Sequence, residues 1–239
     1  MIVIPDVHGR TFWRKPVEEC LAKEHILFLG DYLDPYGYEG ISAQDSTSHF
    51  EEIIALKKEH PDDVTLLLGN HDLHYVDYGL LGGRYDYVLG EKNKKLITDN
   101  ASLFAISHIA VIDDKKFLFT HAGLRKGWVK NHREIFGDMG TTEVALALNL
   151  MWSETLHRSI LLSILEDVPF SRLGNSPYGS PVWSDVDDMD LDQTDFPGWY
   201  QIFGHTQQVS EPVIGKYYAC LDCRRAFRLT DTGDIVEYD

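Results

Sequence analysis

Residues 26–35 read ILFLGDYLDP, and the fold expected for this chain follows from this stretch. Four apolar residues in succession, without alternation, are typical of a short strand buried on both faces of a parallel sheet. Gly30 ends the run, and Asp31 stands at the strand tip, where open α/β sheets carry their working residues. Asp34 follows on the same turn. Alone, the stretch indicates only a strand and an Asp-rich turn.

The same pattern recurs along the chain, because four other apolar runs also end in Asp, Asn or His. Residues 1–5 lead to Asp6 and His8, residues 64–68 to Asn70 and His71, residues 117–120 to His121, and residues 200–204 to His205. These side chains are hard-to-borderline metal ligands, with no thiolate among them. We therefore interpret the strand ends together, as parts of a metal site.

Composition sets the broad class. A chain of 239 residues is long enough for a well-buried core in one α/β domain or two. Its hydrophobic fraction of 44% and charged fraction of 25% are those of a soluble globular protein. A net charge of -16 argues against nucleic acid or an anionic membrane as the standing partner.

Several features favour the cytoplasm. No apolar run reaches transmembrane length, and the first residues already form a strand with no basic leader or cleavage site before it. Three cysteines form no disulfide pattern, which fits a reducing compartment. Cys220 and Cys223 make a lone CxxC, which we interpret as two packed small residues.

Periodicity and turn residues predict the remaining elements. We expect helices over residues 16–24, 42–60 and 93–104, a loop over residues 73–90, and a hairpin of residues 105–112 and 116–120 turning at Asp113 and Asp114. Residues 141–165 predict the longest helix, capped by Thr141 or Thr142 and well buried. Residues 170–197 predict a long loop, and residues 212–238 predict antiparallel strands.

Five motifs follow one another along the chain: Asp6-x-His8-Gly9, Gly30-Asp31-x-x-Asp34, Gly69-Asn70-His71-Asp72, His121-Ala122-Gly123 and Gly204-His205-Thr206. Their order resembles the calcineurin-like metallophosphoesterases over residues 6–205. Within that superfamily the chain is most similar to the phosphoprotein phosphatases and the bacterial symmetrical diadenosine tetraphosphate hydrolases. His121 to Leu124 with Trp128 is similar to the hydrolases, and Trp183-Ser184-Asp185 is similar to the protein phosphatases.

The resemblance implies an α/β fold, a four-layer α/β/β/α sandwich with two mixed sheets. We expect one metallophosphoesterase domain over residues 1–239, with residues 126–197 as a helical and loop insert that covers one rim of the site. Such a cover favours a small or extended phosphorylated molecule over a folded phosphoprotein.

The resemblance also implies the ligand set. Asp6, His8 and Asp31 would hold one divalent metal, and Asp31, Asn70, His121 and His205 the other. Mixed nitrogen and oxygen ligands suit Mn, Fe or Zn. Two such ions can hold a hydroxide between them and clamp phosphoryl oxygens.

His71 and Asp34 form a second pair. His71 follows the ligand Asn70, so it can point at the leaving-group oxygen and protonate it. Asp34 is in the family's position for the carboxylate that orients this histidine. Asp72 is an alternative partner, and Asp34 could instead only cap a turn.

Three departures from the family pattern concern phosphate binding. Pro35 stands where the phosphatases carry an arginine, no arginine lies between Asp185 and Cys223, and Gln207 replaces a frequent second histidine. The candidates for a phosphate clamp are therefore Arg10 and Arg125, each close behind a ligand motif.

These observations predict an enzyme, a metal-dependent phosphoesterase that hydrolyses phosphate esters or phosphoanhydrides by attack of a metal-bridging hydroxide at a dinuclear centre. The substrate would be a phosphorylated small molecule or nucleotide. Within enzymes, the alternatives are a serine/threonine protein phosphatase and a dinucleoside polyphosphate hydrolase. From another class, the alternative is a catalytically retired fold that acts as a protein-binding scaffold. A nuclease is disfavoured by the acidic charge balance.

Overall fold

The computed structural model describes residues 1–77, 83–189 and 196–238. The chain divides into two compact units: unit 1 comprises Met1–Ala105 and Arg224–Asp239, and unit 2 comprises Ile106–Cys223. Each unit contains one sheet, and both sheets are mixed. This mixed α/β architecture confirms the expected fold class. The expectation of a single domain stays a prediction.

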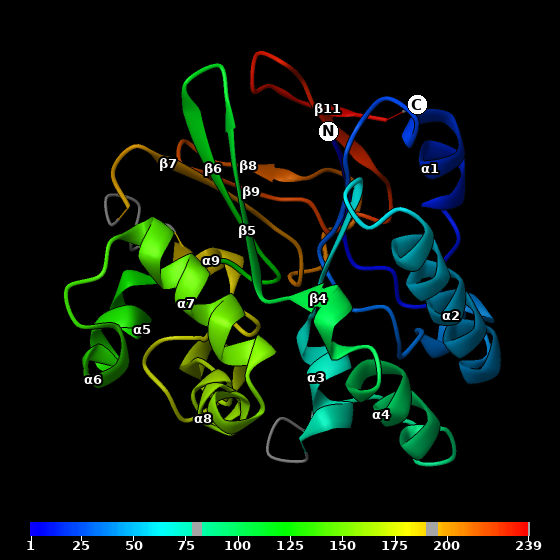
Figure 1. The fold of residues 1–239 in the computed structure, drawn as a ribbon, viewed down its shortest axis with the longest axis horizontal. Coiled ribbons are helices and arrows are strands. Elements are labelled where there is room, and N and C mark those ends of the chain that lie inside the picture. Colours follow the sequence, from blue (N-terminus) through cyan, green and yellow to red (C-terminus); the bar gives the residue numbers. More distant parts are fainter. Residues whose placement is uncertain (78–82, 190–195, 239) are drawn as a thin grey trace. The chain divides into compact units, whose positions relative to one another are not determined.

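Unit 1 is built on a six-stranded sheet of order β11-β10-β1-β2-β3-β4 (Figure 1). Its strands are β1 (Ile2–Ile4), β2 (Ile26–Phe28), β3 (Val64–Leu67), β4 (Phe104–Ala105), β10 (Phe227–Leu229) and β11 (Ile235–Glu237). Strands β1 to β4 run parallel, while β10 and β11 pair antiparallel at one side. The central strand β2 is buried throughout, as its continuous apolar run predicted.

Helices of unit 1 connect these strands. They are α1 (Arg14–Cys20), α2 (Ala43–Glu59), α3 (Asn70–Val76) and α4 (Gly90–Thr98), with 3-10 turns at Gly37–Glu39 and Ala101–Leu103. Ser42 caps α2 by accepting the N–H of Asp45. On the core side of α2, Phe50 stacks on Tyr32 with 4.8 Å between ring centroids.

The expected loop over residues 73–90 is wrong at its beginning, because helix α3 extends from Asn70 to Val76 and includes the first residues of that range. The Asp72 side chain accepts the N–H of Gly69 and so satisfies a donor at the helix start. Residues 78–82 of the expected loop lie outside the described residues. The helix expected at 93–104 is α4, which begins earlier, at Gly90, and ends at Thr98, before the 3-10 turn at Ala101–Leu103 and β4.

Unit 2 is built on a five-stranded sheet of order β5-β6-β7-β9-β8. Its strands are β5 (Ser107–Ile112), β6 (Lys115–Thr120), β7 (Trp199–Phe203), β8 (Val213–Ile214) and β9 (Tyr218–Cys220). The expected hairpin is confirmed by the antiparallel β5–β6 pair, whose turn residues Asp113 and Asp114 have φ of +49° and +61°. Strands β6, β7 and β9 run parallel.

The insert of unit 2 is helical, as expected. It contains α5 (Lys126–Asn131), α6 (Arg133–Phe136), α7 (Thr141–Ser153), α8 (Thr155–Leu165), a 3-10 turn at Phe170–Arg172 and α9 (Val186–Met189). Residues 190–195 of the expected long loop lie outside the described residues. Whether the insert acts as a cover stays a prediction.

The single long helix expected over residues 141–165 is wrong. The helix is interrupted at Glu154, whose ψ of 118° is that of extended backbone. Near this interruption, the Arg158 side chain donates to the carbonyl of Trp152. The cap is Gly140, not a threonine, and its N–H bonds Glu143.

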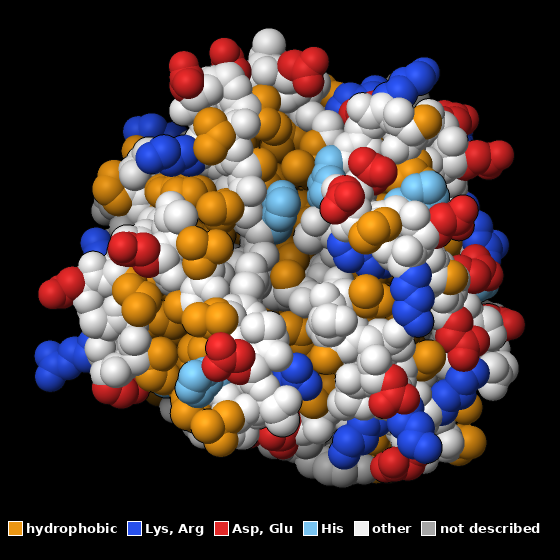
Figure 2. All heavy atoms as spheres, in the orientation of Figure 1, with side chains coloured by type: hydrophobic (Ala, Val, Ile, Leu, Met, Phe, Trp, Pro, Cys, Tyr) orange, Lys and Arg blue, Asp and Glu red, His pale blue; other side chains and the backbone are white. Residues whose placement is uncertain are grey.

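The expected burial of these helices is also only partly met. Large apolar side chains remain exposed on α7 and α8, namely Leu146, Leu150, Leu156 and Ile160. Hydrophobic side chains are visible on the surface over this part of unit 2 (Figure 2).

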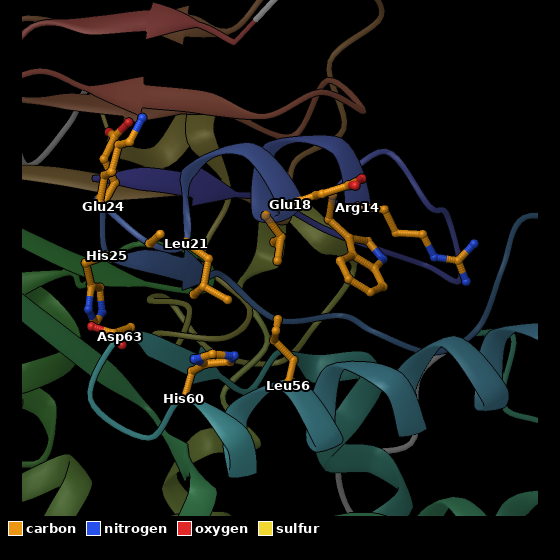
Figure 3. Close-up of a pocket in the computed structure, with 12 residues that line it drawn as sticks. Arg14, Glu18, Leu21, Glu24, His25, Leu56, His60 and Asp63 are labelled. Atoms are coloured by element: carbon orange, nitrogen blue, oxygen red, sulfur yellow. The ribbon is translucent and has the colours of Figure 1, made fainter.

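A cavity of about 680 Å³ lies in unit 1, lined by residues of α1 and of the end of α2. Figure 3 shows Leu21, His25, Leu56 and His60 around it. His25 precedes β2 and the lining residue Asp63 precedes β3, so the cavity opens at the amino ends of these strands. Active sites of parallel sheets form at the opposite, carboxyl ends.

Among the helices of the described residues, none combines the length and the apolar character that crossing a membrane requires.

Candidate metal centre

The carboxyl ends of β1, β2 and β3 bring polar residues to one edge of the unit 1 sheet. Asp6 and His8 follow β1, Asp31 follows β2, and Asn70 follows β3. All four are buried, with exposed fractions of 1%. Three parallel strands in register therefore gather the ligand types that the sequence predicted for this edge.

The tautomer of His8 shows what this cluster can hold. Its Nδ1 lies 2.8 Å from the carbonyl oxygen of Leu33, which can only accept, so Nδ1 carries the hydrogen. Burial lowers the pKa of His8 to about 3, despite the opposing charge of Asp31, so the imidazole is neutral.

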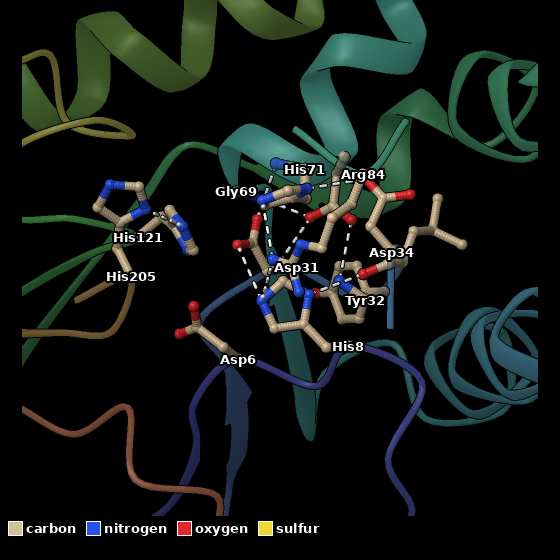
Figure 4. Close-up of polar contacts among 12 residues, drawn as sticks. Asp6, His8, Asp31, Tyr32, Asp34, Gly69, His71, Arg84, His121 and His205 are labelled. Atoms are coloured by element: carbon tan, nitrogen blue, oxygen red, sulfur yellow. Dashed lines mark hydrogen bonds and ion pairs between the residues drawn. The ribbon is translucent and has the colours of Figure 1, made fainter. Parts of the chain in front are cut away.

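The Nε2 lone pair of His8 consequently faces Oδ2 of Asp31 at 3.5 Å (Figure 4). Two acceptors that face each other in a buried site are unfavourable unless a cation lies between them. Ligand atoms of Asp6, His8 and Asp31 lie within 4.8 Å of one another. These residues fit a divalent metal ion of mixed nitrogen and oxygen ligation.

Backbone conformation sets this cluster apart. His8, Asp31, Asp34 and Arg84 all have positive φ, between +44° and +70°. Among the described residues of unit 1 other than glycine, Arg224 alone shares this feature. Left-handed conformations of such residues are costly and persist where the surroundings enforce them, which is typical of functional sites.

Asp72 enforces the conformation around Asp31. Its Oδ2 accepts the N–H of Asp31 at 2.7 Å and of Gly69 at 2.9 Å, while Oδ1 accepts the N–H of Tyr32 at 2.9 Å. The Asp31 carboxylate in turn accepts the N–H of His71 at 2.9 Å. Asp72 is thus a buried acceptor for the backbone and not the alternative partner of His71.

The structure brings His71 and Asp34 together. Nδ1 of His71 lies 2.8 Å from Oδ2 of Asp34, so the alternative in which Asp34 only caps a turn does not hold. His74 approaches the same oxygen through Nε2 at 2.7 Å, and the hydroxyl of Tyr75 donates to Oδ1.

The charge of Asp34 depends on these partners. Burial opposes its ionisation, but the bonds to His71 and His74 outweigh burial and place the pKa of Asp34 below its ordinary value. Burial, followed by the charge of Asp34, raises the pKa of Tyr75, so Tyr75 stays a neutral donor.

The site residues predicted from the sequence did not include His74, Tyr75 and Arg84. The spacing of His74, three residues after His71, places both on one face of a helix, so a helix prediction here would have found it. Arg84 comes from the segment expected to be a loop. Its Nη2 lies 3.0 Å from Nε2 of His71 and 3.4 Å from Nε2 of His8.

The two predicted phosphate-binding arginines are both buried and paired. Arg10 donates to both carboxylate oxygens of Glu39 at 2.9 Å and to the carbonyl of Asp6. Arg125, in unit 2, lies 3.3 Å from a carboxylate oxygen of Asp188.

Unit 2 places His121 and His205 at the carboxyl ends of its adjacent parallel strands β6 and β7. Nε2 of His121 lies 3.2 Å from Nδ1 of His205, and His205 has a φ of +65° (Figure 4). Paired imidazole nitrogens of this kind suit a borderline divalent metal.

The motif Trp183-Ser184-Asp185 lies next to this pair. Asp185 forms an ion pair with Arg172, with 2.9 Å between Oδ2 and Nε, and Nη2 of Arg172 donates to the hydroxyl of Thr206, the residue after His205. An arginine thus occurs beside the motif although none lies between Asp185 and Cys223. Cys220 and Cys223 are free and buried, in keeping with packed residues.

Known structures share this fold. A cold-active protein tyrosine phosphatase is 18% identical with a TM-score of 0.54, and the match covers 99% of this chain and 77% of that protein. A second cold-active protein tyrosine phosphatase, from a psychrophilic Shewanella species, is 17% identical with a TM-score of 0.52, covering 99% and 79%. A serine/threonine phosphatase from Saccharomyces cerevisiae is 15% identical with a TM-score of 0.51, covering 92% and 65%.

A family model described as calcineurin-like phosphoesterase matches residues 1–209 of the 239. That family is metal-dependent, which agrees with the facing acceptors of His8 and Asp31. The chain therefore belongs to the calcineurin-like phosphoesterases, and it is a metallophosphoesterase that hydrolyses phosphoric esters.

Proposed function

We propose that the protein hydrolyses phosphate esters or phosphoanhydrides at a dinuclear centre of Mn, Fe or Zn. The proposed ligands are Asp6, His8, Asp31, Asn70, His121 and His205. Family membership supports this set, and so does the geometry inside each unit. When bound, two divalent ions would activate water and neutralise the phosphoryl oxygens.

The observation that carries the proposal is the pair formed by His8 and Asp31. The hydrogen on Nδ1 of His8 is fixed by the carbonyl of Leu33, which leaves Nε2 as an acceptor against a carboxylate. A cation bound by both acceptors would offset their repulsion, so a metal ion is the natural occupant.

We propose His71 as the general acid. Asp34 accepts the Nδ1 hydrogen and so fixes the ring, which leaves Nε2 to donate its proton to the leaving oxygen. The Asp34 carboxylate also stabilises the imidazolium form before that transfer. His74 and Tyr75 hold Asp34 in place from α3.

The proposed substrate is a phosphorylated small molecule or a nucleotide. Pro35 in place of the phosphatase arginine supports this choice over a phosphoprotein. The free, buried cysteines support a cytoplasmic location.

The test loads the metal-free protein with Mn, Fe or Zn. Turnover is then measured on monoesters, diesters, dinucleoside polyphosphates and phosphopeptides. We expect two ions per chain by elemental analysis, and release of phosphate or nucleotide from at least one small substrate. Absence of turnover with every metal on every substrate would sink the proposal.

Asp31 provides the sharper variant. Asp31→Asn should lower the content of both metals together, since the proposed bridge serves both sites. Asp62→Asn, at an exposed carboxylate of the same unit, is the matched control and should keep the wild-type content. An undisturbed two-metal content in Asp31→Asn would contradict the bridging assignment.

A further inference from the structure

We propose that Arg84, seated on the ring of Tyr36, binds phosphoryl oxygens of the substrate. This inference rests on the proposed function, because it assigns the phosphate clamp of that same site. Neither Arg10 nor Arg125, the two arginines predicted from sequence, would then be the principal clamp.

The position of Arg84 supports the assignment. Its Nη2 lies between Nε2 of His71, at 3.0 Å, and Nε2 of His8, at 3.4 Å (Figure 4). The first is the atom proposed to meet the leaving oxygen, and the second belongs to a proposed metal ligand. A phosphoryl group that reacts here must have its oxygens within reach of this guanidinium.

Tyr36 holds the guanidinium in a defined plane. The Cζ of Arg84 lies 3.6 Å from the centroid of the Tyr36 ring, and His8 packs edge-on against the same ring with 5.1 Å between centroids. Stacking orients the planar guanidinium while leaving its N–H edge available. Tyr36 follows Pro35, so the segment that lacks the family arginine supplies a platform for another one.

The present partners of Arg84 leave it available for an anion. Within the described residues its recorded contacts are two histidine nitrogens and the face of Tyr36, with no carboxylate among them. A guanidinium has five N–H donors, and two histidine nitrogens satisfy few of them. Phosphate oxygens form charge-assisted, bidentate bonds with arginine, so they are the better partners.

The other arginine near the cluster contrasts with Arg84. Arg10 also lies over Tyr36, with Cζ 5.3 Å from the ring centroid, but its Nε and Nη2 both donate to the Glu39 carboxylate and its Nη1 donates to the carbonyl of Asp6. Binding phosphate through Arg10 would require breaking that partly buried ion pair, which is costly. The Arg84 side chain is exposed, so a ligand reaches it without such a loss.

Backbone conformation adds an independent observation. Arg84 has a φ of +70°, which non-glycine residues seldom adopt, and it shares this feature with His8, Asp31 and Asp34. Gly83 directly precedes it, so the segment has a residue beside Arg84 that accepts strained geometry easily. Costly left-handed conformations of this kind are typical of functional sites.

The test measures binding of inorganic phosphate, the expected product, to metal-loaded protein by calorimetry, together with metal content and with KM and kcat on an active substrate. Arg84→Met keeps an aliphatic side chain of similar length and removes the guanidinium group. We expect it to weaken phosphate binding about tenfold or more and to raise KM, as loss of a charge-assisted pair should. Metal content should stay unchanged.

Two further variants separate charge from geometry. Arg84→Lys keeps the positive charge without the planar guanidinium, and it should bind phosphate more tightly than Arg84→Met but less tightly than wild type. Tyr36→Leu removes the aromatic ring on which the guanidinium stacks. It should weaken phosphate binding although Arg84 itself is unchanged. Arg14→Met is the control, because Arg14 is an exposed arginine of the same unit paired with Glu52, and it should bind phosphate as wild type does.

The outcomes distinguish this inference from the proposed function. Wild-type phosphate affinity in metal-loaded Arg84→Met would overturn the role of Arg84 while the phosphoesterase stands. A fall in kcat alone, with unchanged phosphate affinity and KM, would also overturn it, since Arg84 would then act on His71. Failure of the wild type to bind metal at all would instead refute the proposed function, and the role of Arg84 with it.

Discussion

Asp72→Asn tests how the protein shapes its metal site without touching a ligand. The carboxylate is fully buried and accepts three backbone N–H groups, from Gly69, Asp31 and Tyr32, at 2.7 to 2.9 Å. An amide has the same shape but offers only one accepting oxygen. If that oxygen takes the place of Oδ2, the NH₂ group faces the N–H of Tyr32, and two donors then confront each other.

The magnitude follows from these three bonds. Two of them change from charge-assisted to neutral, which costs about 0.5–2 kcal/mol each, since net values are about 1.5–3 and about 1 kcal/mol respectively. The third leaves a buried N–H without an acceptor, which costs about 1–3 kcal/mol. We therefore expect Asp72→Asn to lower the free energy of unfolding by about 2–7 kcal/mol, a large share of the roughly 5–15 kcal/mol of a typical domain.

The same change should reach the metal site. Asp72 ties the peptide of Asp31 to Gly69, directly before the helix that carries Asn70 and His71. Weaker hydrogen bonds from residue 72 would let Asp31 leave its left-handed conformation, at φ of +51°. The affinity for metal should therefore fall although no proposed ligand is altered.

The assay is urea unfolding of the metal-free protein, followed by circular dichroism and tryptophan fluorescence, with metal content measured separately. Asp62→Asn is the control, because that carboxylate is exposed and its loss should stay within about 0.5 kcal/mol. A loss below about 1 kcal/mol in Asp72→Asn at an unchanged denaturant slope would refute the reasoning, since the three bonds would then contribute little.

Two further predictions concern histidines. His71→Asn should slow hydrolysis of alkyl phosphates far more than of nitrophenyl phosphate, by about 10²–10⁴ in kcat for the former, because only the alkoxide needs a proton to leave. Asp34→Asn should show the same selectivity in weaker form, and equal losses on both substrates would exclude a general acid here. Burial, followed by the charge of Lys57, lowers the pKa of His25 in the folded state, so the unfolded chain takes up the proton first and stability falls as the pH drops below about 6.5. His25→Gln should therefore lose less stability than wild type between pH 7.5 and pH 5 in urea titrations, and an equal loss would show that His25 contributes nothing to that dependence.

The strand ends of unit 1 were predictable because two signals coincide there. An apolar run without alternation predicts a doubly buried strand, and a polar residue directly after it marks the carboxyl end. The parallel order β1-β2-β3 then places Asp6, Asp31 and Asn70 at one edge. The hairpin turn at Asp113 and Asp114 was equally local.

Helix α3 escaped prediction because its buried side is polar. Asn70, Asp72 and His74 are as buried as Leu73, so hydrophobic periodicity has almost nothing to detect. Hydrogen bonds made across unit 1 compensate for that burial, and they depend on residues about 40 positions away, such as Asp31 and Asp34. Such long-range partners have no signature in a local window.

The break between α7 and α8 has a similar cause. The sequence around Glu154 contains neither proline nor glycine, so local propensity continues the helix. The carbonyl freed at Trp152 is satisfied by the side chain of Arg158, a contact that only the folded geometry reveals. Arg84 was missed because the conformation of a loop follows no period.

Carboxylates that bind no metal account for much of the order at this edge of unit 1. Asp72 holds the backbone in position by accepting three N–H groups. Asp34 holds side chains in position, because one of its oxygens contacts His71 and His74 and the other accepts the hydroxyl of Tyr75. Both act on α3, one from its first turn and one from the facing loop. The ring that would donate the proton is consequently positioned by a helix, which is a rigid support, although the residue that orients it lies in a loop. A site assembled in this way needs its non-ligand acids as much as its ligands.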